Sequence, residues 1–128
     1  IPNTVTISGV TYPVTSISAG AFQGCKKLKS VTIGKNVADI GARTFSKCTA
    51  LTKIILPVKL RKIGKQAFSG CKRLKNITIR SKQLKSVGKN AFQGIHAKAK
   101  IKVPKAKLKA YKKLLKKKGQ GKQVKITK

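Results

Sequence analysis

Hydrophobic positions recur along this chain in a frame of 23 or 24 residues. The four phenylalanines mark the frame, because they stand at positions 22, 45, 68 and 92. An aliphatic residue lies five positions before each of them, at Ile17, Ile40, Ile63 and Val87. Two more follow each at nine and eleven positions, at Val31 and Ile33, Ile54 and Leu56, Ile77 and Ile79, and Ile101 and Val103. A fixed period of this length is typical of repeat architectures, in which each unit stacks on its neighbours.

Each unit is predicted to contain one short strand. In the first full unit, residues 28–36 read LKSVTIGKN and fit the phrase L-x-x-L-x-L-x-x-N. Val31 and Ile33 fall on one face of an extended chain and Thr32 falls on the other, as in a strand with one buried side. Such a strand cannot bury its apolar face alone. The units are therefore expected to stack about 5 Å apart and to form a parallel sheet.

The start of the chain and the fourth unit depart from this frame. Residues 4–14, TVTISGVTYPV, alternate apolar and polar side chains around Ser8 and Gly9, which predicts a short hairpin that caps the repeats. In the fourth unit Lys98 stands where the earlier units have Leu28, Leu51 and Leu74. Terminal units of repeat arrays are commonly atypical, so this departure is expected near the end of the array.

A helix is predicted after the last unit. Pro104 suits its first position and Gly119 suits its stop, and the apolar stripe between them comprises Leu108, Tyr111, Leu114 and Leu115. The stripe could lie on an anionic membrane, but a cap over the otherwise open core is favoured. Residues 124–127, VKIT, are expected to add a last strand. We therefore expect a single domain over 1–128, with an N-terminal cap (1–13), repeats (14–104) and a C-terminal cap (105–128).

The repeated phrase resembles a known class of repeat. Its form is I-G-x-x-A-F-x-G-C-x-x-L-x-x-I-x-I-P, and four tandem copies lie between Val14 and Pro104. This phrase is similar to the BspA-like leucine-rich repeats of bacterial surface proteins and some parasitic protists. The resemblance implies a leucine-rich repeat solenoid of about four 23-residue units that is secreted or displayed on a bacterial cell. It also implies a role in attachment to host or neighbouring-cell components, without naming a ligand.

The charge of the chain is strongly one-sided. Lysine and arginine number 32 and acidic residues number 1, which gives a formal net charge of +31. Apolar residues still make up 40% of the sequence, so a folded domain is expected in place of a disordered basic tail. No run of 18 apolar residues is present, and a membrane-spanning helix is not expected. The N-terminal sequence IPNTVTISGV has no initiator Met and neither the basic nor the long apolar region of a signal peptide, so the chain is expected to be a processed or excised piece of something longer.

The three cysteines recur inside the same phrase, at Cys25, Cys48 and Cys71. A zinc site needs four ligands at about 2.0–2.3 Å, and the outer two cysteines are expected about 10 Å apart, so no metal site is predicted. A disulfide between neighbouring units has a permitted Cα separation, although parallel side chains disfavour its geometry. The favoured interpretation is a buried column of small apolar thiols, because free cysteine is among the most buried residue types.

Candidate catalytic groups are few. The chain has one carboxylate, Asp39, and one histidine, His96, which fall in different units and at different positions of the frame. General acid–base chemistry needs such groups within hydrogen-bond reach of a substrate, and stacking is expected to keep these two at least about 10 Å apart. The glycines follow the repeat and form no phosphate-binding motif. We therefore expect no enzyme activity and no cofactor.

The expected binding surface is the concave face of the sheet, as in other solenoids. Its candidate ligand-binding residues are Lys29, Ser30, Thr32, Thr52, Lys53, Lys75, Asn76, Thr78, Lys100 and Lys102. Ammonium, hydroxyl and amide groups suit the oxygens of an anionic polymer such as cell-wall teichoic acid, a sulfated or sialylated host glycan, or extracellular DNA. The face lacks aromatic side chains for base stacking, so any nucleic-acid binding is expected to be nonspecific.

Two other interpretations remain open at this point. The charge could serve only to solubilise an elongated surface, and the repeats could form a structural spacer or a filament component that assembles end to end. Proteins of a host or neighbouring cell are also candidate partners. The alternatives differ in what they predict, since a capped array that binds a polymer is expected to remain a monomer by itself.

Overall fold

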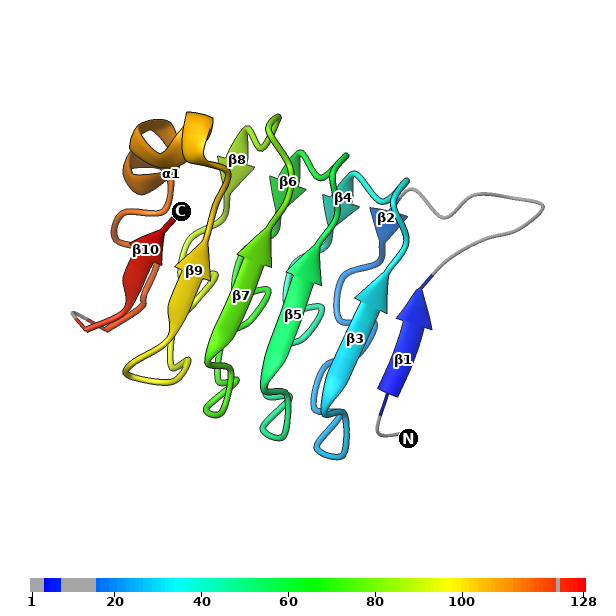
Figure 1. Ribbon diagram of the computed structural model, residues 1–128. Helices are drawn as coiled ribbons and strands as arrows, with labels where there is room; N and C mark the ends of the chain where they lie inside the picture. The colour runs from blue at the N-terminus through cyan, green and yellow to red at the C-terminus, as the bar shows by residue number, and fades with distance from the viewer. Residues whose placement is uncertain (1–3, 8–15, 122) are drawn as a thin grey trace.

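The computed structural model describes residues 4–7, 16–121 and 123–128 of the chain. Over these residues the chain winds into a solenoid whose turns pass alternately through a longer and a shorter strand (Figure 1). The larger sheet has six described strands in parallel: β1 Thr4–Ile7, β3 Ser30–Ile33, β5 Lys53–Leu56, β7 Asn76–Ile79, β9 Lys100–Lys102 and β10 Lys125–Thr127. The smaller parallel sheet has four: β2 Ser16–Ile17, β4 Asp39–Ile40, β6 Lys62–Ile63 and β8 Ser86–Val87.

The core lies between the two sheets and is built from the repeated hydrophobic positions. Equivalent residues of successive turns are register partners, so each position forms a column that runs through the stack. The larger sheet contributes a buried column of Val31, Ile54, Ile77 and Ile101, with Ile126 partly buried at its end, and the smaller sheet contributes a buried column of Ile17, Ile40, Ile63 and Val87. The predicted alternation within the long strands is confirmed, because Thr32 is exposed between two buried residues.

Each turn of the repeat array contributes one phenylalanine to the interior, and the four rings form a stack. Their centroids lie 5.6, 5.5 and 5.6 Å apart, with planes within 7° of parallel. The chain turns sharply beside each ring, because the residues two positions before and two positions after it have positive φ. The glycine of the phrase occupies the second of these positions, as Gly70 does at φ 78°, whereas Lys47 takes it in the second unit at φ 60°. The sharp turn thus explains the glycine that follows three of the four phenylalanines by two residues.

A second set of glycines lets neighbouring turns approach closely. A Cβ on Gly64 would lie 2.5 Å from the amide nitrogen of Ala42, and one on Gly88 would lie 2.3 Å from that of Lys65. The Gly64 amide donates a hydrogen bond of 2.8 Å to the carbonyl of Ile40 in the preceding turn. These positions lie at the edge of the smaller sheet, where a side chain would push the turns apart.

Both ends of the chain add a strand to the larger sheet. β1 pairs in parallel with β3, and β10 pairs in parallel with β9, so the sheet extends beyond the four predicted units. The last strand expected over 124–127 is thereby confirmed. The hairpin expected around Ser8 and Gly9 falls on residues outside the described part of the chain.

The C-terminal helix is shorter than predicted. After a 3-10 turn, Lys105–Lys107, helix α1 covers Leu108–Leu114, and the chain then bends back into a further turn of the solenoid. The amide of Phe92 donates to the carbonyl of Lys118 at 2.9 Å, which joins this last turn to the array and requires the helix to end early. The predicted apolar stripe does pack on the core, with Tyr111 and Leu115 buried. The Tyr111 hydroxyl also donates to the carbonyl of Ser81 at 2.7 Å and accepts from the amide of Leu84 at 3.0 Å.

Candidate binding surfaces

The outer face of the larger sheet carries two columns of side chains in register. The first column contains Ser30, Lys53, Asn76, Lys100 and Lys125. The second contains Thr32, Ile55, Thr78, Lys102 and Thr127. The parallel pairing brings these groups together from five turns of the chain. Seven of the ten predicted ligand-binding residues therefore share one face.

The remaining three predicted residues lie at the rim of this face. Each of them directly precedes a long strand and is exposed: Lys29 before β3, Thr52 before β5 and Lys75 before β7. Their backbones link the turns, because the Thr52 amide donates to the Lys29 carbonyl and the Lys75 amide donates to the Thr52 carbonyl. The structure thus places the ten residues along one side of the solenoid, while their role in binding stays a prediction.

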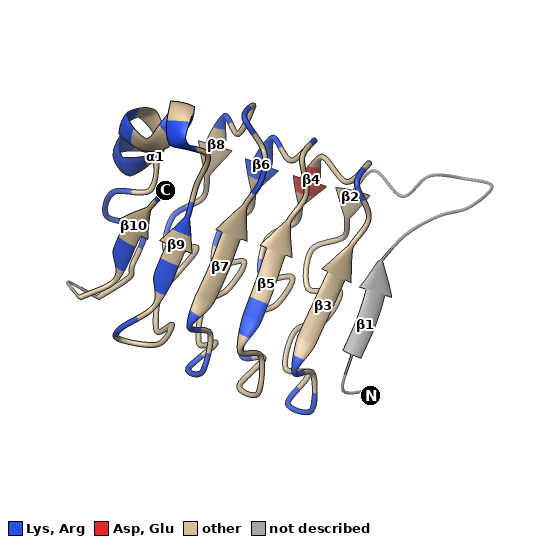
Figure 2. Ribbon diagram, viewed as in Figure 1, with Lys and Arg blue, Asp and Glu red and all other residues tan. Residues whose placement is uncertain are grey.

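The cations are not evenly spread over this face. Figure 2 shows lysine on β5, β9 and β10 and none on β3 or β7, with many more on α1 and on the loops at the ends of the strands. Within the first column, lysines alternate with Ser30 and Asn76 before they become continuous at Lys100 and Lys125. The face therefore has a polar half, followed by a strongly cationic end at β9 and β10.

An apolar feature interrupts the face. Ile55 is 45% exposed and Val58 is 51% exposed, and both line a shallow hollow of about 240 Å³ over β3 and β5. The guanidinium-bearing Arg80 and the ammonium-bearing Lys35 also line it. The alternation of the strand accounts for the outward position of Ile55. The exposure of Val58 follows from its place after Pro57, beyond the end of β5, which the repeat frame does not describe.

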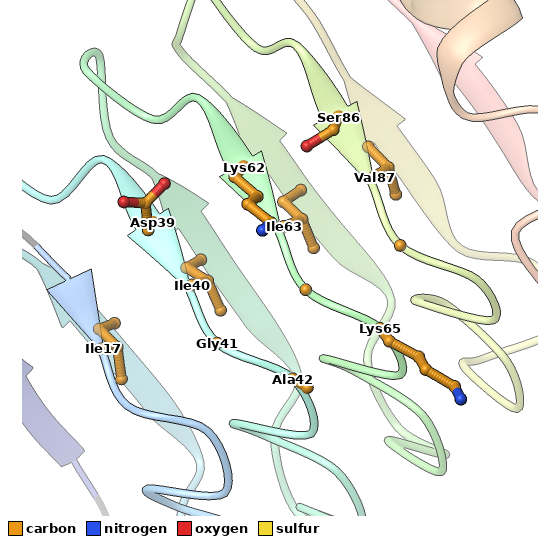
Figure 3. A pocket seen from close by; sticks show the side chains of 12 residues that line it. Ile17, Asp39, Ile40, Gly41, Ala42, Lys62, Ile63, Lys65, Ser86 and Val87 are labelled. Carbon is orange, nitrogen blue, oxygen red and sulfur yellow. The ribbon is translucent and has the colours of Figure 1, made fainter.

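A larger hollow, of about 650 Å³, lies beside the smaller sheet (Figure 3). Asp39, Lys62 and Ser86 line it from three consecutive turns and are register partners. Ala42, Lys65 and three glycines line the other side of the hollow, and Ile40 and Ile63 lie between the two sides. The hollow thus combines one carboxylate, two ammonium groups and one hydroxyl from three consecutive turns.

The cysteines form the predicted buried column of free thiols. Two of the thiols, those of Cys48 and Cys71, also donate hydrogen bonds, which the sequence did not indicate. The Cys48 thiol donates to the carbonyl of Phe22 at 3.1 Å, and the Cys71 thiol donates to the carbonyl of Phe45 at 3.0 Å. Burial raises the pKa of Cys48 to about 11 and that of Cys71 to about 12. These thiols are therefore neutral at physiological pH and are poor nucleophiles and metal ligands.

Comparison with known proteins identifies the family to which this repeat architecture belongs. The model of the BspA type leucine-rich repeat region matches residues 3–118 in six copies. The chain belongs to this family. A leucine-rich repeat protein from Bacteroides ovatus, solved as a crystal structure, superposes on the BspA-type chain with a TM-score of 0.77 at 31% sequence identity. The match covers 97% of this chain and 29% of that protein, so the chain spans less than a third of the relative's length. A search of curated proteins found no match.

Membership in the BspA-type family indicates a role in protein binding or adhesion, on a solenoid that typically serves as a noncatalytic scaffold. The two residues considered for catalysis lie apart in this scaffold. Asp39 lies on β4 of the smaller sheet, whereas His96 lies in the turn before β9, where its Nδ1 accepts a hydrogen bond of 3.0 Å from the amide of Lys98. Among the described residues, no three His, Cys, Asp or Glu side chains gather at a site that could hold a metal ion. Nor does any described helix have the length and apolar character to cross a membrane.

Proposed function

We propose that this chain is a noncatalytic binding module of a secreted or surface-displayed bacterial protein, and that its sheet face engages anionic polymers. The observation that supports this most directly is the composition of the face. Its two columns contain ammonium, hydroxyl and amide groups and one isoleucine, and the described strands that carry them have no carboxylate. The only acidic residue of the chain, Asp39, lies on the smaller sheet.

The spacing of the columns suits a polymer. Neighbouring turns are separated by the distance between stacked phenylalanine rings, 5.5–5.6 Å. This distance is shorter than the Debye length of about 8 Å at physiological salt, so the lysines of the neighbouring strands β9 and β10 act together on a ligand. A polymer that neutralises several of them releases counterions, which contributes affinity that depends strongly on salt.

The chemistry of the face also indicates which polymers it suits. Lysine binds phosphate, sulfate and carboxylate oxygens as a point charge, and the hydroxyl and amide groups add hydrogen bonds. The described part of the face has no aromatic ring on which a base could stack. We therefore favour teichoic acids and sulfated or sialylated glycans, together with DNA bound through its backbone only.

The test is a binding titration of the folded chain against heparin, teichoic acid and double-stranded DNA at several salt concentrations. Binding that is tight at low salt and falls steeply as salt rises is the expected result. The absence of binding to all three polymers at low salt would refute the proposal. Association of the chain with itself as its concentration rises would then favour a structural spacer or filament.

Two matched variants separate the sheet face from charge alone. Each variant removes four positive charges. The sheet-face variant carries K53Q, K100Q, K102Q and K125Q, and the helix variant carries K109Q, K112Q and K113Q on α1 and K116Q two residues beyond its end. All eight lysines are exposed, so neither set of changes disturbs the core. The sheet-face variant is expected to lose much more affinity for the polymer than the helix variant. Equal losses would show that the face has no special role.

A further inference from the structure

Lys98 breaks the rule that the other repeats obey. In the first three units its position is occupied by Leu28, Leu51 and Leu74, which are completely buried. Lys98 is exposed, and the neighbouring Ala99 is completely buried. A lysine at this position gives up the hydrophobic stabilisation that a buried leucine provides in the other turns. Departures from a structural rule are expected at functional or strained sites as well as in the terminal units of an array, so the surroundings of Lys98 decide its role.

The side chain of Lys98 joins a group of cations at the end of the sheet face. Lys98, Lys100, Gln123 and Lys125 line a hollow of about 400 Å³. Lys100 and Lys125 are register partners on β9 and β10, so their side chains leave adjacent strands on the same face. The hydrogen bond from the Lys98 amide to His96 Nδ1 holds the turn that carries Lys98. Three ammonium groups and one amide therefore surround a single hollow.

This arrangement lacks a counter-charge of its own. Like charges directly opposite each other on paired strands are destabilising, and a third ammonium adds to the repulsion. The described residues that line the hollow include no carboxylate, and Asp39 lies on the smaller sheet. A bound anion would compensate for the repulsion and accept hydrogen bonds from the ammonium groups and from the Gln123 amide.

We propose that this hollow binds one phosphate or sulfate ester group. The inference rests on the proposed function and deepens it, because it names the point on the sheet face where one anionic group of the polymer is held. Three ammonium groups line the hollow, and their number matches an oxyanion with three free oxygens better than a carboxylate, which has two. A hollow of about 400 Å³ is larger than one such oxyanion, so it also has room for part of the sugar or polyol that carries the ester.

A second cationic hollow provides the control. Lys26, Lys72 and Arg73 line a hollow of about 410 Å³ elsewhere on the solenoid, where Lys26 and Lys72 stand two turns apart. Two turn spacings separate these cations by about 10 Å, so they cannot all contact one oxyanion. K72Q therefore removes the same charge as K98Q, from a cationic hollow that the proposal does not assign to an ester.

The experiment is a titration of the isotope-labelled chain with methyl phosphate and, separately, with methyl sulfate, followed by amide NMR shifts at constant ionic strength. The largest saturable shifts are expected at residues 98–100 and 123–125. We expect K98Q and K125Q each to weaken the binding of the preferred ester about fivefold, and K72Q less than twofold, since one ammonium at about 4 Å contributes about a factor of five. The preferred ester identifies the class of polymer.

Three results would overturn the inference: saturation by neither ester, shifts spread evenly over all the lysines, or equal effects of K98Q and K72Q. Its failure is distinguishable from that of the proposed function. If the polymers bind and K98Q does not affect the esters, the sheet face binds without this site. If the esters bind at the hollow and no polymer binds, the site exists and the proposed function is wrong.

Discussion

The close approach of neighbouring turns at Gly64 leads to a sharp prediction for Gly64→Ala. The new Cβ would lie 2.5 Å from the backbone of both Ala42 and Gly41, whereas ordinary contact begins at 3.4 Å. Both obstacles are backbone atoms of the preceding turn, so no flexible side chain can yield. The two turns would have to separate by the difference between these distances, about 0.9 Å, at the edge of the smaller sheet.

The cost of this separation can be worked out from the contacts that it breaks. Two of the backbone hydrogen bonds that join the turns here run from Gly64 to Ile40 at 2.8 Å and from Lys62 to Ala38 at 3.1 Å, and losing both costs about 2 kcal/mol. A gap approaching 1 Å also forfeits about a quarter to a half of the dispersion energy between Ile40 and Ile63, or about 1 kcal/mol. The lower backbone entropy of alanine in the unfolded chain offsets about 0.5 kcal/mol. We expect a net loss of about 2–3 kcal/mol.

The assay is urea unfolding followed by circular dichroism, with two other glycine-to-alanine variants as controls. Gly121 has nothing within 4 Å of an added Cβ, and Gly24 has open space but a φ of 74°. With a slope of about 1–3 kcal/mol per molar urea, Gly64→Ala is expected to lower the midpoint by about 1 M or more. Gly121→Ala is expected to leave it unchanged, and Gly24→Ala to cost about 1 kcal/mol from backbone strain alone. A midpoint for Gly64→Ala equal to that of Gly121→Ala would refute the reasoning.

Two further predictions concern buried polar groups. Because burial raises the pKa of Cys71 from 9.0 to about 12, its thiol should resist alkylation in the folded chain at pH 8 and react once urea unfolds it; rapid reaction in the native state would contradict this. The folded state keeps this proton while the unfolded state releases it, so the contribution of Cys71 to stability is complete below pH 9 and is lost as the pH rises towards 12, a slope that Cys71→Ala should reduce. Tyr111→Phe leaves the Ser81 carbonyl and the Leu84 amide without their hydroxyl partner and should cost about 1–3 kcal/mol of unfolding free energy. Hydrogen exchange of the Leu84 amide should accelerate in this variant, and an unchanged rate would show that the hydroxyl does not hold the loop.

The repeat frame predicted the larger sheet well, because each turn presents the same side chains at the same height. The alternation of Val31, Thr32 and Ile33 was enough to indicate which face is buried. The smaller sheet was not predicted, because one strand was expected in each unit and the second strand has only two residues, too few to show a period. The positive φ of Lys47 was not predicted either, because a lysine, unlike a glycine, does not indicate a left-handed turn.

The candidate sites depended more on details that the frame does not describe. The outward columns could be predicted from alternation, which placed Lys53 and Lys100 on one face. The grouping of Lys98 with Lys125 could not be predicted, because it depends on a last turn formed after the helix. The helix was predicted to extend to Gly119 because the apolar spacing continues through Leu115. In the structure it ends at Leu114, because backbone hydrogen bonds to the preceding unit hold the following residues in a further turn of the solenoid.

The hydrogen bonds that join successive turns have a mechanical consequence if the module works in attachment, as proposed. These bonds point along the axis of the stack. A pulling force along that axis therefore stretches the bonds between one pair of turns at a time and does not shear the bonds of many turns together. Each 23-residue turn that peels away becomes about 75 Å of extended chain. The turn had occupied only 5.5–5.6 Å of the stack. The solenoid is therefore built to lengthen in steps under tension, and each step would dissipate energy before an attached surface pulled free.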